Sequence, residues 1–179
     1  MSKATLIDVS SELLPEELDR IYREHYRLVY RTAYGVTGRA EEAEDVVQTL
    51  FLQLLRRGFP PALMKNPKAY LYRAAVNLSL NTIRKRQRDV LTDDVGRFEA
   101  AVHANDASLL EELHKHLYAA IAQLDSDSAQ MLVLRYVHNY SDAEIAKLLG
   151  KSRVVIAVRL FRSRARLKQL IRALQGESS

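Results

Sequence analysis

Apolar residues recur every three or four positions along most of the 179-residue chain, which is the spacing of amphipathic helices. No stretch sustains the strict alternation of apolar and polar residues that marks a half-buried strand. The pattern therefore predicts an all-α protein. The expected helices cover about residues 15–34, 40–57, 109–124, 127–138, 141–149 and 152–174, together with one that Asn66 caps and Pro67 begins.

Two of these helices are expected to meet at Gly150. Ser141 and Glu144 form the S-x-x-E capping box that begins the helix at 141–149, and Ser152 can cap the helix that follows. Glycine is typical of a helix end because it tolerates a left-handed backbone. Helices joined by so tight a turn predict a helix-turn-helix, whose second helix lies in the major groove of DNA.

Charge is unevenly distributed along the chain, although the net charge is only +5. Residues 66–88 hold six basic residues and no acidic one, residues 89–112 hold seven acidic and one basic, and residues 151–172 hold eight basic and none acidic. A single basic run is usually a solvated helix face, but two of them on separate units indicate a polyanion as partner. We expect two small helical domains joined by an acidic linker. The segments are a flexible N-terminus (1–14), a first domain (15–90), the linker (91–108), a second domain (109–174) and a flexible C-terminus (175–179).

Composition argues against several classes of site. The chain has no cysteine, which excludes disulfides and thiolate metal sites and fits a reducing compartment. It shows no apolar run of membrane-spanning length and no signal-peptide pattern, so we expect a cytoplasmic protein without membrane insertion. The Gly150-Lys151-Ser152 run lacks the strand and first glycine of a phosphate-binding loop, and Glu111-x-x-His114 has no second copy to complete a di-iron site. We expect no catalytic residues, metal or cofactor.

The last helix carries a candidate DNA surface. Its core stripe is expected to consist of Ile156, Leu160, Ser163, Leu167 and Ile171. Basic side chains flank the opposite side, where they can grip phosphates while the valines meet thymine methyl groups. The alternative is that this apolar patch packs on protein. The candidate residues are Arg153, Val154, Val158, Arg159, Arg162 and Arg166.

The helix that begins at Pro67 carries a second candidate surface. Leu71, Ala75, Leu78 and Thr82 form its expected packed side. Arginine and asparagine on one face can contact phosphates and base edges, and the preceding loop at 58–65 holds Phe and Pro residues that can receive an unstacked base. The alternative is that the asparagines satisfy neighbouring helices. The candidate residues are Arg73, Asn77, Asn81, Arg84 and Arg88.

Three segments together resemble the extracytoplasmic-function (ECF) sigma factors of bacterial RNA polymerase. They are AEDVVQTLFLQLLRR (43–57), NPKAYLYRAAVNLSLNTIRKRQR (66–88) and LDSDSAQMLVLRYVHNYSDAEIAKLLGKS (124–152), within a resemblance that covers most of residues 18–172. The resemblance implies that the first domain is region 2, which binds core RNA polymerase and the −10 element. The second would be region 4, which binds the −35 element and the polymerase flap. The implied partners are core RNA polymerase, promoter DNA and an anti-sigma factor.

The resemblance also implies roles for individual residues. The −10 contacts fall on the Arg and Asn face described above, and the −35 contacts fall on residues 153–166. Many relatives have a small or polar run where this chain has Val154 to Val158, so the promoters of relatives do not transfer. The polymerase contact falls on Asp45, Gln48 and Phe51, and a helical wheel places Asp45, Gln48, Leu52 and Leu55 on one face away from the core.

Two other functions fit part of the sequence. A stand-alone helix-turn-helix regulator would use the second domain but leaves the Arg and Asn face without a role. A helical adaptor that binds only proteins would not need acid-free basic faces, and any DNA binding would lack salt dependence. We therefore expect a sigma factor without enzymatic activity of its own.

We predict that the free chain binds promoter DNA poorly. The acidic segment of about 24 residues would average roughly 27 Å end to end as a random coil. It is also repelled by DNA, so simultaneous contact with two promoter elements requires polymerase to extend it. Footprinting with and without core polymerase measures the difference, and tight specific protection by the chain alone would contradict the prediction.

Overall fold

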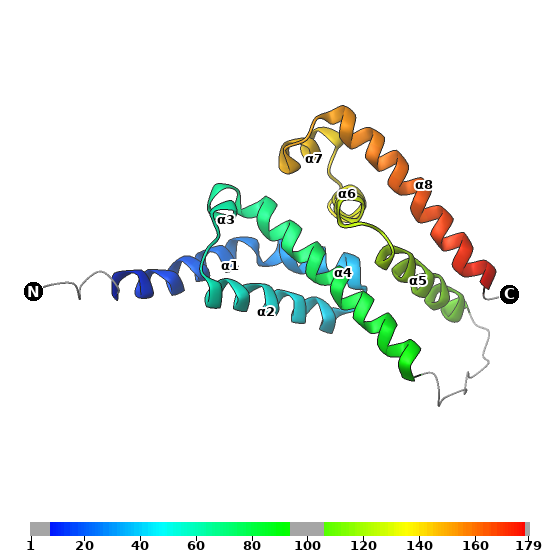
Figure 1. The fold of residues 1–179 in the computed structure, drawn as a ribbon, viewed down its shortest axis with the longest axis horizontal. Helices are drawn as coiled ribbons and strands as arrows, with labels where there is room; N and C mark the ends of the chain where they lie inside the picture. The colour runs from blue at the N-terminus through cyan, green and yellow to red at the C-terminus, as the bar shows by residue number, and fades with distance from the viewer. Residues whose placement is uncertain (1–7, 94–105, 178–179) are drawn as a thin grey trace, which may run out of the picture.

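The computed structural model describes residues 8–93 and 106–177, and side chains within 16–89 and 112–176. All regular structure in those residues is helical, which confirms the all-α prediction (Figure 1). The helices are α1 (Asp8–Thr37), α2 (Ala40–Arg57), α3 (Pro61–Lys65), α4 (Pro67–Asp93), α5 (Asp106–Ala122), α6 (Ser126–Tyr136), α7 (Asp142–Leu149) and α8 (Arg153–Glu177).

The first unit is a bundle of α1, α2 and α4, with the short α3 at one end (Figure 1). Its core holds Val29, Leu50, Leu63 and Leu71. The loop expected at 58–65 contains α3, which begins at Pro61 and is anchored by the fully buried Leu63. Asn66 caps α4 as expected, because its side-chain oxygen accepts from the N–H of Ala69 at 3.0 Å.

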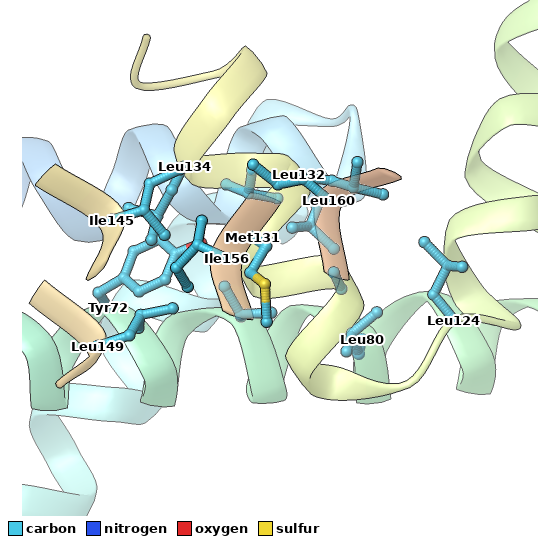
Figure 2. Close-up of a cluster of buried hydrophobic side chains, with 14 of the residues drawn as sticks. Tyr72, Leu80, Leu124, Met131, Leu132, Leu134, Ile145, Leu149, Ile156 and Leu160 are labelled. Carbon is cyan, nitrogen blue, oxygen red and sulfur yellow. The ribbon is translucent and has the colours of Figure 1, made fainter. Parts of the chain in front are cut away.

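The second unit consists of α5 to α8 around a buried core drawn in Figure 2. Met131 and Leu134 of α6 meet Ile145 of α7 and Ile156 and Leu160 of α8. These side chains recur with the spacing of helix faces, so helices α5 to α8 bury their apolar faces against one another.

Helices α7 and α8 form the predicted helix-turn-helix. The capping box is present, with the N–H of Ser141 donating to Glu144 at 2.8 Å and Ser141 Oγ accepting from the N–H of Glu144 at 3.3 Å. Gly150 ends α7 in the left-handed conformation (φ 66°, ψ 38°). Ser152 accepts from the N–H of Val155 at 3.3 Å and so caps α8.

The two units share one continuous apolar core, which the sequence did not predict. Val36 of α1 and the α4 side chains Tyr72, Val76, Leu80 and Ile83 belong to the same buried cluster as the core of the second unit. Figure 2 shows Tyr72 and Leu80 of α4 facing this cluster. Helix α4 of the first unit therefore also packs against the second unit and is buried on two sides.

Several helices are longer than the sequence predicted. Helix α1 begins at Asp8 and passes through Pro15, which is typical of a first helical turn and therefore suggested a start there. Helix α4 runs to Asp93, α5 begins at Asp106 and α8 runs to Glu177. The remaining parts of the segments expected to be flexible or to form a linker, 1–7, 94–105 and 178–179, lie outside the described residues.

Candidate nucleic-acid interface

The N-terminal half of α8 presents basic and apolar side chains to solvent. Its predicted core stripe is buried at Ile156, Leu160 and Ser163, which turns the opposite side outwards. Val154 is 73% exposed and Val158 is also exposed, as are the arginines of the predicted surface. The helix thus offers cations on either side of an apolar strip, an arrangement suited to phosphates and thymine methyl groups.

Phe161 enlarges this apolar strip and was not singled out from the sequence. Its side chain is 68% exposed, one helical turn beyond Val158 and two beyond Val154. The signal was available, because positions 154, 158 and 161 follow the i, i+4, i+7 spacing of one helix face. An exposed Phe on the second helix of a helix-turn-helix belongs with the candidate contact residues.

Arg159 forms an ion pair that the sequence did not reveal. Its Nη1 atom lies 2.6 Å from Oδ2 of Asp127 in α6, and Nζ of Lys151 lies 3.6 Å from the same oxygen. The two partners of the shorter pair have half-exposed side chains, and such surface pairs contribute only about 0–1 kcal/mol. Arg159 therefore remains able to exchange its carboxylate partner for a phosphate.

The predicted DNA face of α4 contacts the second unit. Arg84 donates from Nε to the carbonyl of Ala122 at 2.9 Å and from Nη2 to that of Leu124 at 2.8 Å. Arg73 donates from Nη2 to the carbonyl of Leu149 at 3.2 Å.

The other members of that face differ in their surroundings. The amide oxygen of Asn77 accepts a hydrogen bond from the hydroxyl of Ser126, so this asparagine does satisfy a neighbouring helix, the alternative considered from the sequence. All five residues of this face are exposed, and Arg73, Asn77 and Arg84 also form the hydrogen bonds described above.

The predicted polymerase-binding face of α2 is exposed, with one exception. Asp45 and Gln48 are exposed, and Leu52 and Leu55 have nearly half of their surface open to solvent. Phe51 is only 7% exposed, belongs to the core of the first unit and meets Tyr22 edge to face at 4.8 Å between ring centroids. The expectation that Phe51 faces a partner is therefore corrected, because position 51 borders the core stripe formed by Val47, Leu50 and Leu54.

His138 lies where the two units meet. The hydroxyl of Thr32 donates to the carbonyl of Leu28 at 2.7 Å, so its oxygen accepts from Nε2–H of His138 at 2.9 Å. The rings of Tyr72 and Tyr140 lie edge-on to the imidazole, with centroids 5.9 and 6.0 Å away. Residues from α1, α4 and the loop after α6 thus enclose this ring.

The pKa of His138 is lowered to about 4, first by burial and then by the positive charges of Arg31 and Lys68. Arg31 belongs to α1 and Lys68 to α4, so the first unit supplies both cations. The imidazole is therefore neutral at neutral pH.

Neither a metal site nor a membrane-spanning segment is found in the part of the chain that the structure describes. No three His, Asp or Glu side chains gather there as a metal would require. None of the described helices combines the length and the apolar character needed to cross a bilayer.

Residues 21–89 match the family description Sigma-70 region 2, and residues 114–167 match Sigma-70, region 4. The chain is 32% identical to the ECF RNA polymerase sigma factor SigL of Mycobacterium tuberculosis over 155 residues, which cover 79% of this chain and 85% of SigL. It is 27% identical to SigW of Bacillus subtilis, covering 82% of this chain and 84% of SigW. It is also 27% identical to SigE of Mycolicibacterium smegmatis, covering 90% of this chain but 64% of that longer protein.

Solved structures share the fold at lower identity. The sigma factor RpoE of Bartonella quintana, in complex with the anti-sigma factor NepR, has a TM-score of 0.50 at 22% identity, covering 88% of this chain and 98% of RpoE. CnrH, in complex with the cytosolic domain of CnrY, has the same TM-score and identity, covering 91% of this chain and 92% of CnrH. A helical protein with both sigma-70 regions in this order is a sigma factor. The chain belongs to the ECF RNA polymerase sigma factors.

We predict that acidification destabilises the packing around His138. In the folded state the pKa of the ring is about 4, whereas the ordinary pKa of histidine is 6.5, so the folded ring stays neutral to a lower pH. This contribution to stability is fully present above pH 6.5 and is lost as the pH falls towards 4. Urea unfolding at about pH 7 and about pH 5 measures the loss. The variant His138→Gln, whose amide can still donate to Thr32, should lose less stability over this interval, and equal losses would contradict the assignment.

Proposed function

We propose that this chain binds core RNA polymerase and directs it to promoters through contacts to the −10 and −35 elements. The observation that carries the proposal is that matches to both sigma-70 regions coincide with the two basic helices, α4 and α8. Polymerase supplies the chemistry, and the chain supplies recognition. Its place of action would be the cytoplasm.

Helix α8 would read the −35 element. Phosphates on the groove walls would be neutralised by the exposed Arg153, Arg162 and Arg166. Arg159 would also bind a phosphate after releasing Asp127. Val154 and Val158, extended by Phe161, would contact base edges in the groove. Because these contacts are apolar, we expect discrimination to come from thymine methyl groups rather than from bidentate hydrogen bonds.

Helix α4 would read the −10 element with Arg73, Asn77, Asn81, Arg84 and Arg88. Guanidinium groups suit phosphates, and asparagine amides suit base edges. The short α3 and its flanking Phe59 and Pro60 lie at the start of α4, where an unstacked base can be received.

The exposed face of α2 would bind core polymerase. Asp45 and Gln48 supply polar contacts, and Leu52 and Leu55 supply apolar surface that is open in the free chain. RpoE and CnrH were solved with an anti-sigma factor and with the cytosolic domain of CnrY respectively, and we propose an anti-sigma factor as a further partner of this chain. A stand-alone regulator would leave the α2 and α4 faces without a role.

The direct test is run-off transcription with core polymerase across a promoter library. We expect specific initiation only when the chain and core polymerase are both present. Failure of the chain to associate with core polymerase would overturn the proposal.

Replacing Arg162 by Ala should weaken promoter binding by the holoenzyme and reduce the slope of log affinity against log salt by about one, because one phosphate contact is lost. Titrations at several salt concentrations provide both quantities. Arg172→Ala, about 15 Å further along α8, is the matched control and should leave the slope unchanged. An unchanged affinity and slope for Arg162→Ala would show that α8 does not lie in the groove as proposed.

Replacing Leu52 by Glu should weaken binding to core polymerase by about tenfold or more, since burial of a leucine side chain typically stabilises an interface by about 1.5–3 kcal/mol. Gln53→Glu places the same side chain one position further around the helix and should have little effect. Fluorescence anisotropy of the labelled chain against core polymerase measures both variants. Equal affinities would exclude this face of α2 from the interface.

A further inference from the structure

One carboxylate, that of Asp127, contacts two cations beside the proposed −35 surface. Its Oδ2 atom lies 2.6 Å from Nη1 of Arg159 and 3.6 Å from Nζ of Lys151. Arg159 belongs to α8, Lys151 lies in the turn between α7 and α8, and Asp127 lies in the first turn of α6. The acidic side chain therefore comes from outside the helix-turn-helix and partly neutralises its basic residues.

The carboxylate of Asp127 contributes little to the fold itself. Asp125, rather than Asp127, caps α6, since its Oδ1 accepts from the N–H of Ser128 at 2.9 Å. The side chains of Asp127 and Arg159 are each 45% exposed, and ion pairs at such exposure add little stability. Exchange of this carboxylate for an amide should therefore leave the fold intact and change mainly what the surface binds.

The same carboxylate opposes the binding of DNA phosphates. A phosphate that binds Arg159 must displace Asp127, which then lies within the screening length of about 10 Å at 0.1 M salt and repels the phosphate. Because Lys151 shares this acceptor, its ion pair is disturbed by the same displacement. A single phosphate contact replaces only one of the two ion pairs, whereas a helix seated fully in the groove can give each cation a phosphate.

We propose that Asp127 is a specificity-determining residue, which lowers the affinity of region 4 for non-promoter DNA more than its affinity for the −35 element. The proposal rests on the assignment of α8 to the −35 element. Non-promoter DNA is held by phosphate contacts alone, so it is subject to the full effect of the carboxylate. At a promoter the exposed apolar strip of α8 adds contacts that seat the helix deeply enough for Lys151 and Arg159 both to reach phosphates.

Asp127→Asn removes the charge and keeps the shape of the side chain. The full chain with this change should bind a labelled random-sequence duplex several-fold more tightly than the unmodified chain, as measured by fluorescence anisotropy. The slope of log affinity against log salt should steepen by about one, because a cation no longer neutralised within the protein displaces one more counterion from DNA. A role confined to stability would change the midpoint of unfolding but not this slope.

Three variants assign the effect to the shared carboxylate. Asp127→Glu keeps the charge and should leave affinity and slope near the unmodified values. Asp19→Asn removes a comparable exposed carboxylate, which lies 2.9 Å from Arg23 in α1, and should change neither quantity. In a chain that already carries Lys151→Gln and Arg159→Gln, Asp127→Asn should raise the affinity less, because neither cation remains for the amide to release. An unchanged or lower affinity of Asp127→Asn for the random-sequence duplex, with the fold intact by circular dichroism, would overturn the proposal.

Competition with non-promoter DNA tests the specificity itself. Holoenzyme reconstituted with the chain transcribes a promoter template while unlabelled random-sequence duplex is added in increasing amounts. Holoenzyme with Asp127→Asn should be inhibited by several-fold less competitor, since its affinity for other DNA rises more than its affinity for the promoter. Equal sensitivity of the two holoenzymes would contradict the specificity role of Asp127. If holoenzyme with the unmodified chain initiates at no promoter, the proposed function fails instead, and the anisotropy measurement still tests the effect of the carboxylate.

Discussion

Helix α4 is apolar on two sides, and the described arrangement depends on burying both of them. Leu71 and Ala75 face the core of region 2, whereas Val76 and Leu80 belong to the core shared with region 4. Each large side chain buried in this way contributes about 1.5–3 kcal/mol, more than a typical exposed ion pair. Apolar packing therefore sets the arrangement, and the hydrogen bonds from the arginines of α4 are a consequence of it. The position of the helix-turn-helix relative to region 2 follows from the same packing.

The proposed surfaces of this chain differ in the contacts that they make within the protein. The face of α2 and the strip on α8 are open, whereas the polar face of α4 is exposed but donates hydrogen bonds to carbonyls at the ends of α5 and α7. Weak binding to DNA by the free chain is expected from the acidic tether.

Local signals in the sequence were sufficient for the helices and for the helix-turn-helix. The capping box at Ser141 and the left-handed Gly150 involve neighbouring residues only, so a short segment contains all the information. Contacts between distant segments were not predictable in this way. Helical periodicity shows that α4 has apolar residues on more than one side but does not identify their partners, and it places Phe51 at the border between core and surface. The acceptors of Arg73 and Arg84 are backbone carbonyls, which no residue type reveals.

Arginines of α4 that are proposed to contact DNA also donate to carbonyls of region 4, and this overlap has a simple chemical origin. A guanidinium group that can bind phosphate is also the group best able to satisfy two carbonyl oxygens, as Arg84 does with Ala122 and Leu124. Any sequence that builds a phosphate-binding helix near exposed helix C-termini therefore builds a competing intramolecular site. Substitutions of these arginines would alter the contact with region 4 and the proposed DNA contact together, so their effects cannot be assigned to either one.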